Sequence, residues 1–105
     1  MAQKVKEEVS SEEIFNHPLY PIFVAAIKQA TIGKGERHGG RSVQFMKQAW
    51  LNKAKTHGRG FLTGQASKKL DEAAETREGE SFEAEMLGAI NYAAMSIIFE
   101  RQKIE

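Results

Sequence analysis

The longest helical pattern in the chain lies at residues 82–103, FEAEMLGAINYAAMSIIFERQK. Apolar residues recur in it at spacings of three and four, so they share one side of an α-helix. These residues are Phe82, Met86, Ile90, Ala93 and Ile97. Ser81 stands just before the stretch and is a residue type that caps helix N-termini. The pattern therefore predicts a long C-terminal helix with an apolar stripe.

Three shorter helical patterns precede this one. The first covers about residues 19–32 and ends at a glycine, and the second covers about 43–56 after a possible cap at Ser42. The third begins at a possible cap, Thr63, and continues to about residue 77. No stretch alternates with a period of two, so no strand is expected. The sequence predicts an all-α helical bundle of about four helices, whose last two form an antiparallel hairpin.

The N-terminal end and the overall composition set the domain organisation. Residues 1–10 have the composition of a charged flexible tail, and residues 11–105 fit one helical domain. A capping box, Ser10 to Glu13, predicts a short helical turn where the domain begins. The chain has no cysteine and no apolar leader or membrane-spanning run, so we expect a cytoplasmic protein without disulfides.

The charge distribution is strongly uneven. Residues 28–69 contain ten Lys or Arg and one acid, whereas the rest of the chain contains five basic and thirteen acidic residues. The centre therefore carries +9 and the remainder −8, although the net charge is only +1. Such asymmetry is typical of a surface that binds an anionic partner. The alternative is that the basic centre neutralises the acidic flanks, within one fold or between subunits.

The most distinctive part of the basic centre is residues 33–42, GKGERHGGRS. Glycines allow the backbone N–H groups to converge on a ligand, and a helix N-terminus after the loop would add unpaired donors. The spacing is not that of a Walker A loop. Five loop residues are predicted to contact phosphate or to hydrogen-bond the ligand: Lys34, Arg37, His38, Gly39 and Arg41. The alternative is an inter-helix loop with solvated charges.

A second glycine–arginine segment lies at residues 55–60, KTHGRG. Gly58 is expected to end a helix in a left-handed conformation, and His57 and Arg59 are expected to join the phosphate site if the two loops meet. Trp50 or Phe61 would stack on a base if exposed. The alternative for Arg59 is a solvated side chain.

Metal chemistry has weaker support in the residue pattern. The three histidines are far apart and lack zinc-ligand spacing, so no metal or other cofactor is expected for the binding function. However, the segments LDEAAE (70–75) and EMLGAI (85–90) resemble the two motif helices of the MazG-like all-α nucleotide pyrophosphohydrolases. The resemblance implies a Mg²⁺-dependent hydrolase with Glu72, Glu75 and Glu85 at the metal. The family's metal-binding Asp falls on Ala89, and the preceding acid falls on Met86.

In size, composition and loop chemistry the chain also resembles small helical proteins of tailed phages. Among these are oligomers that trap the nucleotide second messengers of CBASS or Thoeris immunity. The resemblance implies a non-catalytic anti-defence sponge that acts in the host cytoplasm. It identifies no individual site residues.

Two further hypotheses concern macromolecular partners. Residues 43–77 could mimic a helix-turn-helix, but the second helix would bring acids toward DNA phosphates, so nucleic-acid binding is the weaker alternative. Small residues on the last helix, Gly88, Ala89, Ala93 and Ala94, would allow close approach of a helix from another subunit. The sequence thus favours a homo-oligomer that sequesters a phosphorylated small ligand such as a nucleotide or cyclic nucleotide.

Overall fold

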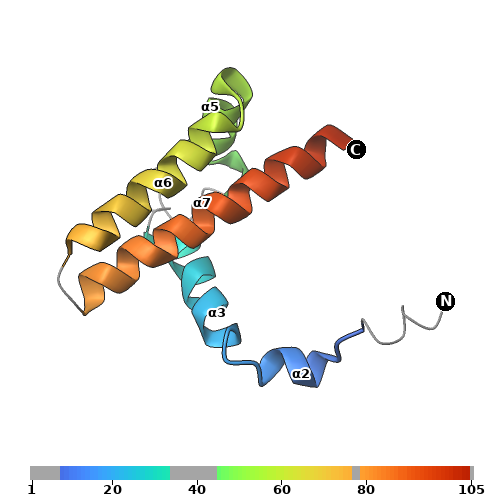
Figure 1. Cartoon of the computed structure of the whole chain (residues 1–105). Coiled ribbons are helices and arrows are strands. Elements are labelled where there is room, and N and C mark those ends of the chain that lie inside the picture. Colours follow the sequence, from blue (N-terminus) through green and yellow to red (C-terminus); the bar gives the residue numbers. More distant parts are fainter. Residues whose placement is uncertain (1–7, 34–44, 77–78, 105) are drawn as a thin grey trace.

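The computed structural model of the 105-residue chain describes residues 8–33, 45–76 and 79–104. Its helices, in chain order, are α2 (Ser11–Phe15), α3 (Tyr20–Lys28), the π-helical turn η1 (Gln29–Gly33), the 3₁₀ turn η2 (Phe45–Lys47), α5 (Ala49–His57), α6 (Gly60–Glu75) and α7 (Glu80–Ile104). Within these ranges all regular structure is helical and there is no strand (Figure 1). The predicted all-α fold is confirmed.

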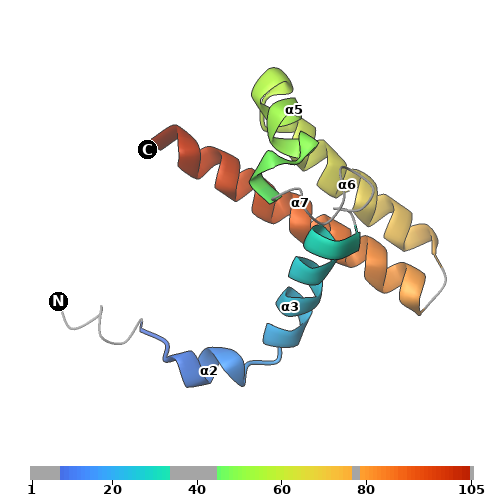
Figure 2. The same ribbon diagram turned by 180° about the vertical axis from the view of Figure 1, so that it is seen from behind.

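The helices α6 and α7 run side by side in opposite directions, as both views show (Figures 1 and 2). Close packing depends on Gly88, because a Cβ there would lie 3.2 Å from the Lys69 side chain of α6. Lys69 crosses this contact and its ammonium lies 3.2 Å from the Glu85 carboxylate of α7. The predicted C-terminal hairpin is therefore confirmed, and it is joined by both a backbone contact and an ion pair.

The largest group of buried side chains lies where α5 meets the hairpin. Leu62 of α6 has no solvent exposure, which makes it the centre of this core. The buried side chains around it come from α5 and from the C-terminal half of α7: Trp50, Leu51, Ala54, Met95 and Phe99. Burial of this apolar surface is the main force holding α5 on the hairpin.

A second contact fixes α3 and η1 on α7 through small and polar residues. Ala26 and Ala30 are buried there, so the helices approach closely. The buried Asn91 amide of α7 donates a hydrogen bond to the Ala26 carbonyl at 3.0 Å. The Gln29 amide of η1 donates to the Ala84 carbonyl at 3.0 Å. Hydrogen bonds and small side chains, rather than a large apolar core, therefore hold the N-terminal helices on α7.

The N-terminal helices agree closely with the sequence. Ser10 and Glu13 form the predicted capping box at α2, with both hydrogen bonds at 3.0 Å. The helix predicted at residues 19–32 is present as α3, with Leu19 as its N-cap and Pro21 in its first turn. Its last part widens into the π-helical turn, which ends at Gly33 as predicted.

The helix predicted at residues 43–56 is too long at its start. Residues 45–47 form a 3₁₀ turn, and α5 begins only at Ala49, because Gln48 is extended with ψ at 162°. The buried Gln48 amide donates to the Ala30 carbonyl at 3.3 Å, a tertiary contact that the local pattern does not contain. The predicted cap Ser42 lies outside the described residues.

The last two helix starts also differ from their predicted caps. α6 begins at Gly60 rather than after Thr63, and the Thr63 hydroxyl donates to the Gly60 carbonyl at 3.4 Å instead of capping the helix. α7 begins at Glu80, so Ser81 lies inside the helix rather than before it. Gly58 has the predicted positive φ of 82°, but its ψ of 176° lies outside the left-handed helical region. Only Gly58 and Arg59 separate α5 from α6, which leaves no room for a longer capped turn.

The apolar stripe that defines α7 in the sequence does not face the hairpin. Phe82, Ala93 and Ile97 are exposed, and Met86 and Ile90 are only partly buried. The buried side chains lie on the neighbouring side of the helix: Leu87, Asn91, Met95 and Phe99. α7 has apolar residues on two sides. Only one of these sides packs against the other described helices.

None of the helices in the described part of the chain combines the length and apolar composition that a bilayer crossing requires.

Candidate functional site

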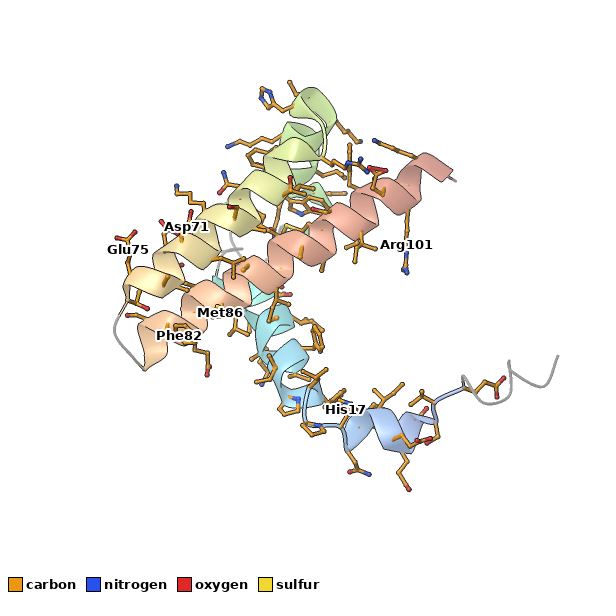
Figure 3. All side chains as sticks on the ribbon, viewed as in Figure 1. His17, Asp71, Glu75, Phe82, Met86 and Arg101 are labelled. Atoms are coloured by element: carbon orange, nitrogen blue, oxygen red, sulfur yellow. The ribbon has the colours of Figure 1, made fainter. Side chains whose placement is uncertain are left out.

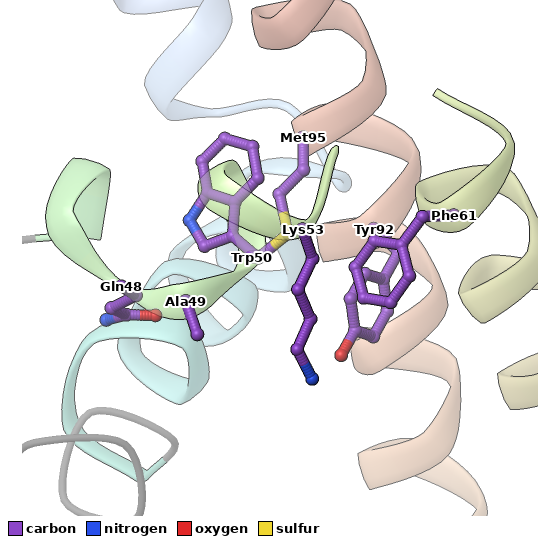
Figure 4. Close-up of a pocket in the computed structure, with 7 residues that line it drawn as sticks. All are labelled: Gln48, Ala49, Trp50, Lys53, Phe61, Tyr92 and Met95. Atoms are coloured by element: carbon purple, nitrogen blue, oxygen red, sulfur yellow. The ribbon is translucent and has the colours of Figure 1, made fainter. Parts of the chain in front are cut away.

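A small pocket lies where the start of α5 meets α6 and α7 (Figure 4). Its volume is about 80 Å³. Since about 10–15 Å³ of such volume holds one water molecule, the pocket has room for a few water molecules or for a single tetrahedral anion. Its lining combines aromatic, amide and cationic side chains: Gln48, Ala49, Trp50, Lys53, Phe61, Tyr92 and Met95.

The start of α5 contributes a positive potential to this pocket. The first N–H groups of a helix have no partner within the helix, and the helix dipole is positive at this end. The N-cap residue Gln48 makes no side-chain cap hydrogen bond. Its amide is used instead to donate to the Ala30 carbonyl. The N-terminus of α5, whose residues Gln48, Ala49 and Trp50 line the pocket, therefore favours an anion there.

Lys53 adds a full positive charge beside two aromatic rings. Its ammonium lies 5.8 Å from the centroid of the Phe61 ring. Figure 4 shows Lys53 extending beside Tyr92, with the ammonium nitrogen and the phenol oxygen on the same side of the pocket. A cation, a hydroxyl and a helix N-terminus at one place can together bind a phosphate or carboxylate group.

Two of the predicted ligand residues line this pocket. Phe61 is partly buried beside Lys53. Trp50 is buried, and its indole N–H donates to the Phe45 carbonyl at 3.0 Å. Trp50 therefore belongs to the core and lines the pocket. Stacking of Trp50 on a base was predicted only if its ring is exposed, and the ring is buried.

The other predicted residues are placed differently. His57 is exposed at the last residue of α5 and does not line the pocket. Arg59 also lies outside the lining, and its guanidinium is 2.8 Å from the Glu100 carboxylate of α7. Although burial opposes it, pairing with Lys103 and Arg59 lowers the pKa of Glu100. The predicted loop contacts lie outside the described residues: Lys34, Arg37, His38, Gly39 and Arg41.

Lys53 and Tyr92 are pocket residues that the sequence patterns did not reveal. Lys53 follows Trp50 by three residues, which places the two close together on one helix. Tyr92 lies far away in sequence, and only the packing of α7 on α5 brings it to the site. The helical spacing could have revealed Lys53, but no local signal identifies Tyr92.

The carboxylates of the hydrolase-like motif surround a lysine. Lys69 Nζ lies 3.2 Å from Glu85 and 3.5 Å from Glu72. Burial disfavours the charged amine, but the hydrogen bonds and charges of Glu85 and Glu72 outweigh it and raise the pKa of Lys69 above its ordinary value. Glu75 is exposed at the end of α6 (Figure 3). The ammonium thus already neutralises two of the three acids that the resemblance assigns to a metal.

The described ranges contain no group of three or more His, Asp or Glu arranged to hold a metal ion. His17, in the link between α2 and α3, uses Nδ1 to accept a hydrogen bond from the Leu19 N–H at 3.1 Å. No protein-family model, curated protein or solved structure matches this chain.

Proposed function

We propose that this protein binds and sequesters a phosphorylated small ligand, a nucleotide or cyclic nucleotide, without transforming it. The observation that supports this most is the pocket at the N-terminus of α5, where Lys53 lies beside Phe61 and Tyr92. A helix N-terminus and an ammonium group favour a phosphate, and the aromatic side chains form the apolar walls around it. The pocket has these features together.

The size of the pocket limits what it can hold. At about 80 Å³ it accommodates one phosphate but not a whole nucleotide. The sugar and base would therefore extend beyond it, over the surface around η2, which carries the exposed Lys47. The glycine-rich residues 34–41 belong to the same proposal, because they contain Lys34, Arg37 and Arg41 and shortly precede η2 in the sequence.

Binding is favoured over hydrolysis by the position of Lys69. A Mg²⁺ ion between Glu72 and Glu85 would have to displace the ammonium that lies 3.5 Å and 3.2 Å from these carboxylates. Nucleic-acid binding is disfavoured by α6, on which Asp71 and Glu75 are exposed (Figure 3). Acids on the helix that would enter a groove repel the phosphate backbone.

The proposed setting follows from the resemblance to small phage proteins. There, such a binder acts in the host cytoplasm and lowers the free concentration of a nucleotide immune signal. The proposal includes association of several copies of the chain. A sponge does not turn over its ligand, so it must be abundant and stable, and a high reaction rate is not required. It requires neither a cofactor nor a metal.

The first test uses native mass spectrometry of the full chain with a panel of linear and cyclic nucleotides and Mg²⁺. An intact nucleotide retained by the protein is the expected result. Trp50 is the only tryptophan, so its fluorescence provides a second readout at the pocket itself. A panel compound converted to a smaller product would establish the hydrolase instead, and no bound mass with any compound would reject the proposal.

A matched pair of variants then tests the site. Lys53→Gln removes the pocket's ammonium, whereas Lys55→Gln removes an exposed charge of the same helix that does not line the pocket. Loss of a charge-assisted hydrogen bond costs about 1.5–3 kcal/mol, so Lys53→Gln should weaken nucleotide binding by about tenfold or more. Lys55→Gln should have a much smaller effect. Equal effects would show that binding follows net charge rather than this pocket.

A further inference from the structure

The segment formed by residues 9–28, called here the N-terminal arm, exposes an unusual amount of apolar surface. Of the thirteen large hydrophobic side chains that are exposed among the described residues, eight lie in this arm. They are Val9, Ile14, Phe15, Leu19, Tyr20, Ile22, Phe23 and Ile27. Their exposed fractions range from 37% to 63%, which is far from the burial that such residues have in a core.

The arm is nevertheless an ordered structure. The capping box starts α2, and the rings of Phe15 and Tyr20 meet edge to face with centroids 5.3 Å apart. Both views show α2 lying away from α6 and α7 (Figures 1 and 2). The radius of gyration is accordingly 15.9 Å, above the roughly 13 Å expected for a compact chain of this length. The apolar side chains are thus held in place while 37% to 63% of their surface remains exposed.

The arm also forms a concave surface. A hollow of about 310 Å³ lies along it, lined by Val9, Ile14, His17, Leu19, Tyr20 and Phe23. Its polar groups are the Tyr20 hydroxyl and the His17 imidazole, whose Nδ1 already accepts the Leu19 N–H. Such a hollow suits the convex apolar side of a helix.

The exposed stripe of α7 has that form. Phe82 and Ile97 are 44% and 55% exposed, and Ala93 and Ala94 between them are exposed small residues. The stripe extends over about 22 Å at 1.5 Å per residue. Asn91, which holds α3, lies about 120° away from it around the helix, at about 100° per residue. The arm of the same chain is therefore fixed on another side of α7 and leaves the stripe open.

We propose that the arm of one chain packs on the α7 stripe of a second copy, and that the second copy's arm does the same in return. This interaction goes beyond ligand binding and does not depend on it. Two-fold symmetry covers both surfaces on both subunits, as an isologous dimer requires.

The exposed area is sufficient for such a dimer. At about 200 Å² for a large side chain, the eight arm residues expose on the order of 800 Å². A stable interface buries about 800 Å² on each partner, whereas the largest apolar patch of a typical monomer is about 300–600 Å². A second copy supplies the exposed apolar stripe of α7, about 22 Å long, as the surface that covers the arm.

The charges at the ends of the two surfaces define their relative direction. The arm has exposed Glu12 at its start and Lys28 at its end. The exposed Glu83 lies near the start of α7. The exposed Arg101 lies near its end (Figure 3). An antiparallel arrangement pairs Glu12 with Arg101 and Lys28 with Glu83, whereas a parallel arrangement opposes like charges. The dimer should therefore place α3 antiparallel to the partner's α7.

The first experiment measures the mass of the full chain in solution by analytical ultracentrifugation. We expect a dimer for the unmodified protein at about 100 μM, and Phe23→Arg or Ile97→Arg should each raise the dimer dissociation constant by about tenfold or more. Leu70→Arg is the control, because Leu70 is equally exposed, at 48%, but lies on α6 outside both surfaces. A monomeric unmodified protein, or dissociation by Phe23→Arg alone, would overturn the proposal.

A second experiment identifies the contact itself. Because the chain has no cysteine, single cysteines report proximity without background. A mixture of Ile27→Cys and Phe82→Cys chains should form a disulfide between unlike chains on mild oxidation, whereas a mixture of Ile27→Cys and Leu70→Cys should not. Equal cross-linking in both mixtures would reject the arm–α7 contact, even if the protein is a dimer.

Discussion

The N-terminal arm and the unit formed by α5, α6 and α7 are both helical and apolar, but they use their apolar residues differently. In the α5–α7 unit, Leu62 is fully buried and the side chains around it come from three helices. In the arm, Leu19 is 53% exposed although it begins a well-formed helix. An apolar helical pattern therefore predicts the helix, while its burial depends on whether another element lies against it.

The largest expected change in stability comes from a comparison of two leucine substitutions, one in each region. Leu62→Ala creates a cavity at the centre of the core and should lower the free energy of unfolding by about 2–5 kcal/mol. Leu19→Ala should lower it by less than about 1 kcal/mol, because this side chain has little packing to lose within one chain. Urea unfolding followed by circular dichroism, at a concentration low enough to avoid association, measures both. Similar losses would mean that the arm is packed in the monomer.

A smaller effect is expected from the turn that joins α5 to α6. Gly58 has φ at 82° and ψ at 176°, a region that only glycine occupies readily. Gly58→Ala should destabilise the protein by about 1–3 kcal/mol through backbone strain alone, because no atom lies within 4 Å of the added methyl group.

The matched control for this turn is Gly64→Ala inside α6. Its added methyl group also meets no atom within 4 Å, and its φ is not positive. This substitution should stabilise the protein by about 0.5–1 kcal/mol, since alanine favours a helix interior over glycine. Replacing glycine by alanine should thus lower the free energy of unfolding at Gly58 and raise it at Gly64. Denaturation of both variants measures this, and equal signs would contradict the backbone argument.

The smallest effect on the stability of the whole protein is expected from a substitution in the arm. Ser10→Ala removes the capping hydrogen bond to the Glu13 N–H, which typically contributes about 1 kcal/mol to a helix. Because α2 does not pack on the hairpin, amide exchange should become faster in residues 11–16 while protection in α6 and α7 stays unchanged. The backbone N–H of Ser10 is the main cause of the lowered pKa of Glu13 and remains in the variant, so the pKa should rise only by the part that the Ser10 side chain contributes. Loss of protection in the hairpin would show that the two regions fold together.

Some features of the candidate site could be predicted and others could not. The hairpin was predictable because two consecutive helical patterns are joined by a short link, but Gly88, which was assigned to contact with another subunit, lies against Lys69 of the same chain. The start of α5 at Ala49 could not be predicted. It depends on a tertiary hydrogen bond from the Gln48 amide to the Ala30 carbonyl, which the local helical pattern does not contain. The pocket at the start of α5 was not predicted: Trp50 and Phe61 were named only as stacking residues if exposed, and Tyr92 reaches the pocket from a distant part of the chain.

By itself, the sequence determined the all-α class, the capped start of α2, the positive φ of Gly58 and the long final helix, because each depends on interactions between residues a few positions apart. The tertiary structure determined which apolar side of α7 is buried. It also placed Lys69 between Glu72 and Glu85, and Lys53 beside Phe61 and Tyr92. These outcomes depend on contacts between distant helices. A periodic pattern shows that a side of a helix is apolar, but only packing determines what covers it.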